Sequence, residues 1–276
     1  MFEKFSRSWS LVKASAAVLR SDKELMLFPV ISTFCTLLVL ATFAIPAFAL
    51  QLFARDIGIA QFLFAFVFYF CQYAVIIFFN CALVGAAMIR LEGGDPTLAD
   101  GIAIAKSRIG AILGYAAIAA TVGMLLQALK NKDNNFIVRL IGSGLGVAWT
   151  LATFLVVPVL VSQNIGPIDA LKRSLELLKR TWGENAIGNV GIGAAFGLIT
   201  VAVILVGGAL TFGAAMLAWQ LAVVVGVLCL ILVLLLGVYQ SALSGIYSAA
   251  LYRYATDGHA PAGFEGMGLQ TAFAPK

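Results

Sequence analysis

Long apolar stretches separated by short charged segments form the dominant pattern of this chain. A helix needs about 20 apolar residues to cross the hydrocarbon core of a bilayer. Six stretches reach that length, at about 26–53, 59–89, 109–129, 136–162, 186–212 and 217–252. Backbone groups in lipid must satisfy their hydrogen bonds internally, so helices are the expected form. The pattern predicts an all-α, polytopic transmembrane helical bundle with six spans.

The connections between these spans alternate in length. Those around Arg55, 130–135 and 213–215 are very short, so we expect six spans in three hairpins. On the opposite side of the membrane the segments 1–25, 90–108 and 163–185 are longer and charged. Each of these precedes one hairpin. This arrangement suggests repeat-like units at about 1–92, 93–164 and 165–256, with a short tail at 257–276, inside a single membrane domain covering 1–276.

The segment 166–185 has the spacing of an amphipathic helix. Its apolar side chains recur every three or four residues, and charged side chains fill the opposite face. Pro167 suits a first helical turn, and Gly183 suits a stop. The stretch Leu11–Arg20 resembles Ala170–Lys179, and the segment before the second hairpin shows a weaker stripe. We therefore expect an amphipathic cytoplasmic helix before each hairpin, with its apolar face toward the acyl chains.

These three helices have two possible roles. They form a collar that binds anionic lipid headgroups or docks a partner, or they only cap the bundle and set its topology. The residues expected to contact the lipid interface are Trp9, Lys13, Arg20, Lys106, Arg108, Lys172, Arg173, Lys179, Arg180 and Trp182.

The positive charge is distributed unequally between the two sides. Of the 18 Lys and Arg residues, the short-turn side holds only Arg55, Lys130, Lys132 and Arg139. The positive-inside rule then places both termini in the cytoplasm, for a multi-pass protein of the inner (cytoplasmic) membrane. The formal net charge of +5 does not indicate nucleic-acid binding, because the basic residues flank apolar spans and no nucleic-acid module is recognisable.

The interiors of the spans carry almost no ionisable side chains. Their absence argues against a proton- or sodium-coupled carrier. Four amides remain, and they either line a neutral, wet cavity or form hydrogen bonds between helices, worth about 0.6 kcal/mol each. They are Gln72, Asn80, Asn189 and Gln240. Pro158 should kink the fourth span, as a hinge or as a fixed bend.

The chain offers no set of residues for catalysis. His259 is the only histidine, no span holds paired carboxylates, and the four cysteines lack metal-site spacing. We expect no catalytic residues, no metal and no cofactor, and therefore no enzyme.

Several short motifs resemble a known family. They are 153–160 (TFLVVPVL), Gly166-Pro167 and 181–185 (TWGEN). Together they are similar to prokaryotic polytopic membrane proteins grouped as a domain of unknown function. The resemblance implies a polytopic helical fold and no established activity.

These observations leave three hypotheses for function. The first is a non-catalytic membrane protein that interacts with lipid or anchors a partner, and that self-associates as a homo-oligomer or joins another membrane protein. The second is a channel or carrier for neutral or apolar small solutes. A membrane-embedded enzyme is the third and has the least support.

Overall fold

The computed structural model describes residues 2–49, 58–131, 136–181, 187–258, 261 and 264, and these are almost entirely helical. The helices are α1 (Phe2–Ser21), a short 3-10 helix η1 (Lys23–Met26), α2 (Leu27–Ala49), α3 (Ile59–Leu91), α4 (Leu98–Ser107), α5 (Ile109–Asn131), α6 (Phe136–Thr153), α7 (Val156–Ser162), α8 (Pro167–Thr181), α9 (Ile187–Leu217) and α10 (Trp219–Asp257).

Six helical segments are long and apolar enough to cross a membrane, which confirms the predicted number of spans. They are Lys23–Ala49, Ile59–Leu91, Ile109–Leu129, Gly144–Ser162, Phe196–Leu217 and Trp219–Asp257. The fourth is built from α6 and α7 rather than from one continuous helix. The sixth continues five residues beyond its predicted end at residue 252, because α10 stays helical through Arg253 to Asp257.

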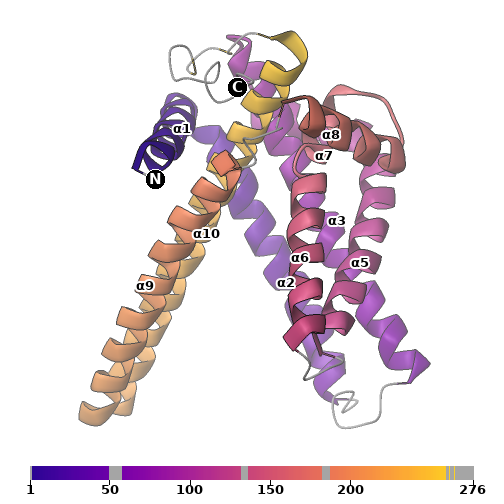
Figure 1. The fold of residues 1–276 in the computed structure, drawn as a ribbon. Coiled ribbons are helices and arrows are strands. Elements are labelled where there is room, and N and C mark those ends of the chain that lie inside the picture. Colours follow the sequence, from indigo (N-terminus) through magenta and orange to yellow (C-terminus); the bar gives the residue numbers. More distant parts are fainter. Residues whose placement is uncertain are drawn as a thin grey trace.

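The spans form two groups that diverge like the legs of an inverted V (Figure 1). One leg is the pair α9–α10, and the other contains α2, α3, α5 and α6. The legs meet at the end where α1, α7 and α8 lie. We call this end the head. It is also where the C-terminal part of α10 packs against α3.

The buried core lies in the head rather than halfway along the spans. The largest fully buried side chains include Phe28, Leu83, Leu160 and Leu251. By contrast, no residue is buried in the 18-residue apolar stretch that makes α9 long enough to span a membrane. In the corresponding stretch of α10, 6% of the residues are buried. The helices are therefore held together mainly at the charged end, and the legs expose apolar side chains.

Helices α1, α4 and α8 pack on the spans in a similar way. Helix α4 lies on α3, α8 lies on α6 and α7, and α1 lies on α10 and α9. Each thus covers the last span of one consecutive pair, and α1 joins the beginning of the chain to its last pair. The sequence similarity between α1 and α8 is matched by this similarity in packing.

The bend expected at Pro158 is present as a break in the helix. Helix α6 ends at Thr153 and α7 begins at Val156, because the proline lacks an N–H and its ring would clash with the carbonyl of Phe154. Ser174 of α8 repairs this break. Its hydroxyl accepts from the Leu155 N–H at 3.2 Å and donates to the Ala152 carbonyl at 2.7 Å.

Replacing Ser174 with alanine is expected to lower the free energy of unfolding by about 1–3 kcal/mol. The Ser174 side chain is fully buried, so its loss leaves the buried N–H of Leu155 without its partner. Ser15, its counterpart in α1, is a matched control. It is equally buried, but its hydroxyl has no hydrogen-bond partner among the described residues. Thermal unfolding in detergent should show a lower midpoint for Ser174→Ala than for Ser15→Ala, and equal midpoints would contradict the role given to Ser174.

Candidate functional site: a polar pocket where the two legs meet

A small polar pocket lies at the junction of the two legs. Asn80 and Val84 come from α3, Phe154 comes from the break between α6 and α7, and Val157 comes from α7. Helix α10 supplies the rest: Ser241, Ser244, Gly245 and Ser248. Its volume is about 170 Å³. The α10 side chains become buried from Val238 onward and are mostly exposed before it, so the pocket marks the point where α10 separates from the other leg.

The polar side chains of this pocket have unused hydrogen-bonding capacity. Asn80 is half-buried, and its amide has no hydrogen-bond partner among the described residues. The same holds for the hydroxyls of Ser241 and Ser244, which are also half-buried. Ser248 donates to the Gly245 carbonyl at 2.8 Å and retains its acceptor lone pairs. The pocket therefore offers donors and acceptors to a neutral group.

The depth of the pocket follows from helix geometry. With a rise of about 1.5 Å per residue, Asn80 lies about 15 Å from Arg90 along α3. On the same basis Ser248 lies about 7–8 Å from Arg253 along α10. Arg90 and Arg253 are at the charged end of their helices, in contact with Asp95 and Glu92. The Ser248 end of the pocket therefore lies just inside the apolar band, below the level of the charged side chains, and the Asn80 end lies deeper.

Three polar links tie the walls of the pocket together on the side of the head. The Ser162 hydroxyl donates to the Met88 sulfur at 3.3 Å, which joins α7 to α3. The Gln163 amide donates to the Tyr252 hydroxyl at 3.1 Å, next to the ion pair between Arg253 and Glu92 that joins α10 to α3. These links join α3, α7 and α10 on the head side of the pocket, where side chains of all three helices are buried.

The four predicted cavity amides have different environments. Asn80 lines the pocket. Gln72 instead donates to the Thr36 carbonyl of α2 at 3.2 Å, which is the hydrogen bond between helices that the alternative interpretation expected. Gln240 is half-buried next to Ser241 and is not among the pocket residues given above. The side chain of Asn189 lies outside the described residues.

The serines of the pocket were missed as site residues. Ser241, Ser244 and Ser248 are spaced at i, i+3 and i+7, which places them on one face of α10. This spacing is visible in the sequence. It does not indicate a site by itself, because a serine in a helix commonly bonds to its own backbone.

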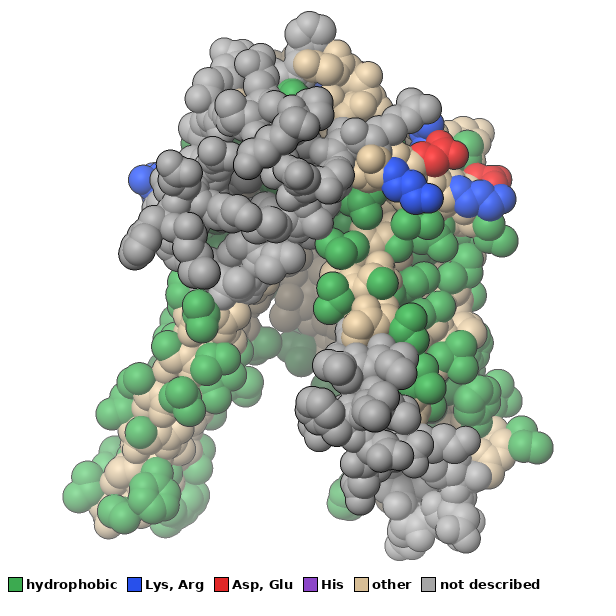
Figure 2. Space-filling view, viewed as in Figure 1, with side chains coloured by type: hydrophobic (Ala, Val, Ile, Leu, Met, Phe, Trp, Pro, Cys, Tyr) green, Lys and Arg blue, Asp and Glu red, His purple; other side chains and the backbone are tan. Residues whose placement is uncertain are grey.

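The described residues predicted to contact the lipid interface lie on α1, α4 and α8 or directly after α4. Five of them have exposed side chains: Lys13, Arg20, Lys106, Lys172 and Lys179. Two are half-buried: Arg108 donates to Asn164, and Arg173 pairs with Glu176 at 3.0 Å. The remaining side chains, of Trp9, Arg180 and Trp182, lie outside the described residues. Figure 2 shows charged side chains gathered at the α8 end of the molecule, above the apolar leg.

The apolar faces of α1 and α8 pack partly on the protein. Val12 and Leu19 of α1 are buried in the core of the head. Leu171, Leu175 and Leu178 of α8 are half-buried, so the orientation of this face toward the acyl chains stays a prediction. An apolar stripe has the same spacing whether it packs on lipid or on protein, because both are apolar.

At the start of α4, Thr97 and Asp100 cap the helix reciprocally. The Thr97 hydroxyl donates to the Asp100 carboxylate at 2.7 Å, and the Asp100 N–H donates to Thr97 Oγ1 at 3.2 Å. The hydrogen bond from the Thr97 side chain holds the pKa of Asp100 below its usual value. This carboxylate is committed to the cap and does not belong to the pocket.

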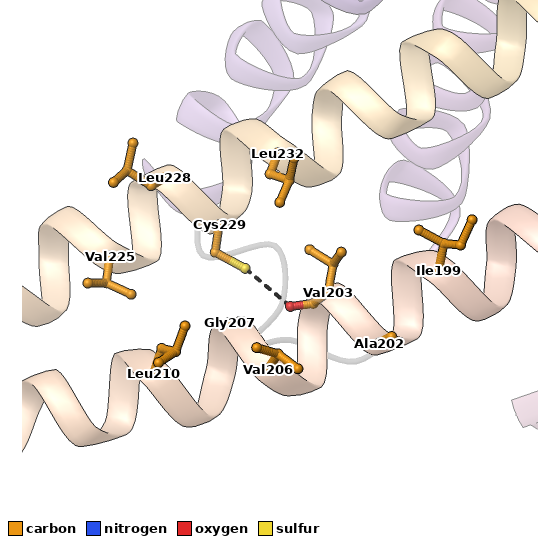
Figure 3. A pocket seen from close by; sticks show the side chains of 10 residues that line it. All are labelled: Ile199, Ala202, Val203, Val206, Gly207, Leu210, Val225, Leu228, Cys229 and Leu232. Atoms are coloured by element: carbon orange, nitrogen blue, oxygen red, sulfur yellow. Dashed lines mark hydrogen bonds between the residues drawn. The ribbon is translucent and has the colours of Figure 1, made fainter.

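A second hollow of about 630 Å³ lies between α9 and α10 (Figure 3). Apolar side chains such as Ile199, Val206 and Leu232 line it. The Cys229 thiol points to the Val203 carbonyl, with 3.8 Å between sulfur and oxygen. Gly207 lies against this thiol without room for a Cβ. The lining fits only an apolar group. Among the described residues, no cluster of His, Cys, Asp and Glu forms a metal site.

The chain matches the model of a known protein family. The match covers residues 59–264, which is most of the chain. The chain belongs to DUF6159, a family of unknown function. This confirms the resemblance seen in the sequence. The DUF6159 match includes every residue that lines the polar pocket. A comparison with curated proteins gives no match.

Proposed function

We propose that this DUF6159 protein is a non-catalytic integral membrane protein that interacts with lipid. Acyl chains occupy the cleft between the legs, and the cations of α1, α4 and α8 meet anionic headgroups. The observation that carries this proposal is the separation of α9–α10 from the other spans, shown as an open cleft in Figure 2. Both sides of the cleft belong to helices that are long and apolar enough to cross a membrane.

The physical reason is the apolar surface of the two legs. Large side chains such as Leu205, Phe212 and Leu228 are 60% or more exposed. Contact with water would cost about 25 cal/mol for each Å² of apolar surface, whereas lipid tails are as apolar as leucine and impose no such cost. No described segment fills the cleft, so the surrounding acyl chains are its natural occupants.

The orientation in the membrane is part of the same proposal. We propose that the head lies on the cytoplasmic side of the inner membrane, with three hairpin units that each begin with an amphipathic helix. In a cysteine-free background, Lys132→Cys should react with a membrane-impermeant thiol reagent only from outside the cell. Lys106→Cys is the control, because its side chain is exposed in the head and should react only from the cytoplasmic side. Reversed labelling would overturn this orientation.

A carrier or channel for neutral solutes is a second candidate function, favoured by the unpaired polar groups of the pocket. It requires a path through the head, where Phe28, Leu160 and Leu251 are fully buried. Flux of a neutral solute into proteoliposomes, abolished by Asn80→Leu or Gln240→Leu, would favour this function over the lipid-interacting one.

Native mass spectrometry of the protein released from phospholipid nanodiscs tests the lipid proposal. We expect a series of discrete lipid adducts that survives mild activation. Bare protein at the lowest activation energy would contradict it. A two-copy complex free of lipid would also contradict it, because a second copy would then fill the cleft.

A further inference from the structure

We propose that the pocket at Asn80, Ser241 and Ser244 binds the ester-linked glycerol region of a neutral diacyl lipid whose chains occupy the cleft. This inference rests on the proposed lipid-interacting function and names the lipid class that the site selects. It gives the pocket one occupant, a lipid with carbonyl and hydroxyl groups and no charge at this level.

The chemistry of the pocket fits such a group. The Asn80 amide supplies donors and an acceptor, and the serine hydroxyls supply either. Ester carbonyls accept hydrogen bonds, and a free glycerol hydroxyl does both. No charged side chain lines the pocket, and the nearest counter-charges are already paired in the head, as between Arg253 and Glu92. A charged headgroup would find no partner here, and burying an unpaired charge is costly.

The size and depth of the pocket agree with the same group. A volume of about 170 Å³ holds roughly five or six water-sized groups, since a water molecule takes about 30 Å³. The polar interface beyond the hydrocarbon core contains the headgroups, and the glycerol esters connect them to the chains. The pocket begins just inside the apolar band at Ser248 and extends to Asn80, about 15 Å below Arg90. A neutral lipid can place its esters at this depth because it has no charged headgroup to hold it at the level of the charged side chains.

The direction of access separates a lipid from a water-soluble ligand. Toward the head, the side chains of α3, α7 and α10 that follow the pocket are buried, and the three polar links join these helices. Toward the legs, α10 departs from α3 below Val238, and its side chains become mostly exposed. A ligand therefore reaches the pocket sideways from the bilayer, as a lipid can do.

The test compares a diacylglycerol with its diether analogue, which has the same chains and hydroxyl but lacks the ester carbonyls. Both are added in equal amounts to phosphatidylcholine nanodiscs holding the full chain. Native mass spectrometry then measures which one is retained. We expect the unmodified protein to retain the diester at least several-fold better. Equal retention would overturn the inference without requiring any variant.

A triple variant, Asn80→Leu with Ser241→Ala and Ser244→Ala, then tests the residues themselves. It should lose the preference for the diester at least tenfold, since an apolar pocket leaves the carbonyls without donors. Gln72→Leu is the matched control, because it removes the same kind of side chain from the same helix and should keep the preference. A triple variant that unfolds at the temperature of the unmodified protein and keeps the preference would refute the assignment.

The outcomes also separate this inference from the proposed function. The unmodified protein and the triple variant could both retain phosphatidylcholine, with no preference for the diester that depends on Asn80. That result would show that the pocket assignment alone is wrong. No retained lipid of any kind defeats the proposed function as well. Entry of free glycerol into proteoliposomes that depends on Asn80 would overturn the assignment in favour of a solute path.

Discussion

Replacing Gly101 with alanine is expected to lower the free energy of unfolding by about 3 kcal/mol. A Cβ at this position would lie 2.7 Å from the Ala82 carbonyl oxygen and would overlap the Phe28 ring. The carbonyl belongs to the backbone of α3 and cannot rotate away, and Phe28 is fully buried. Overpacking a rigid site of this kind typically costs 1–3 kcal/mol and sometimes more. The cost should be among the largest of any single methyl group added to this protein.

Thermal unfolding in detergent measures this effect. Gly110→Ala is the matched control, because no atom lies within 4 Å of the position where its Cβ would be. That change should be neutral or slightly stabilising, since alanine is favoured over glycine in a helix by up to about 1 kcal/mol. Gly101→Leu should prevent the head from assembling and abolish recovery of folded protein. If Gly101→Ala unfolds at the same temperature as Gly110→Ala, the close packing of α4 on α3 is wrong.

Neutralising the cations of α8 is expected to weaken the retention of anionic lipid at least tenfold. The change replaces four side chains with glutamine: Lys172, Arg173, Lys179 and Arg180. Each Lys or Arg close to an anionic surface contributes about 1 kcal/mol. The full sum is not expected, because Lys172 lies 3.5 Å from Asp169 and Arg173 lies 3.0 Å from Glu176. These exposed pairs partly neutralise the face.

Those two ion pairs also provide the matched control. Asp169→Asn with Glu176→Gln releases both cations and should strengthen the retention of anionic lipid. Retention of phosphatidylglycerol by the folded protein measures both changes, and higher salt should reduce the difference between them. Unchanged retention in the quadruple variant would show that α8 only caps the bundle.

The sequence was sufficient for the spans because length and hydropathy alone decide whether a helix can cross a bilayer. The number of spans follows from that rule, and the break at Pro158 follows from the geometry of proline. The repair of the break by Ser174 could not be foreseen. It depends on how α8 rotates about its axis when it packs on α6 and α7.

The environments of Gln72 and Asn80 could not be distinguished from the sequence alone. Both are amides on α3, eight residues apart, and both had the same two interpretations. Gln72 bonds to a carbonyl of α2, whereas Asn80 shares a pocket with serines of α10 that lie more than 160 residues further along the chain. Only the way in which distant helices meet distinguishes a structural hydrogen bond from a pocket.

The open shape of the molecule could not be predicted for a related reason. In lipid, a leucine gains little by turning from an acyl chain to another helix, so hydropathy does not say which spans pack together. Residues such as Leu205 and Leu243 look alike in the sequence, yet the first is 68% exposed and the second is fully buried. The difference comes from the contacts of α10 with α3 in the head.

The proposed function requires lipid in the cleft between α9–α10 and the other leg. The most direct measurement is a cryo-EM structure of the protein in nanodiscs made from native membrane. We expect acyl-chain density in the cleft, continuous with density for a glycerol-ester region near Asn80. Legs closed against each other, or helices of a second protein chain filling the cleft, would contradict it.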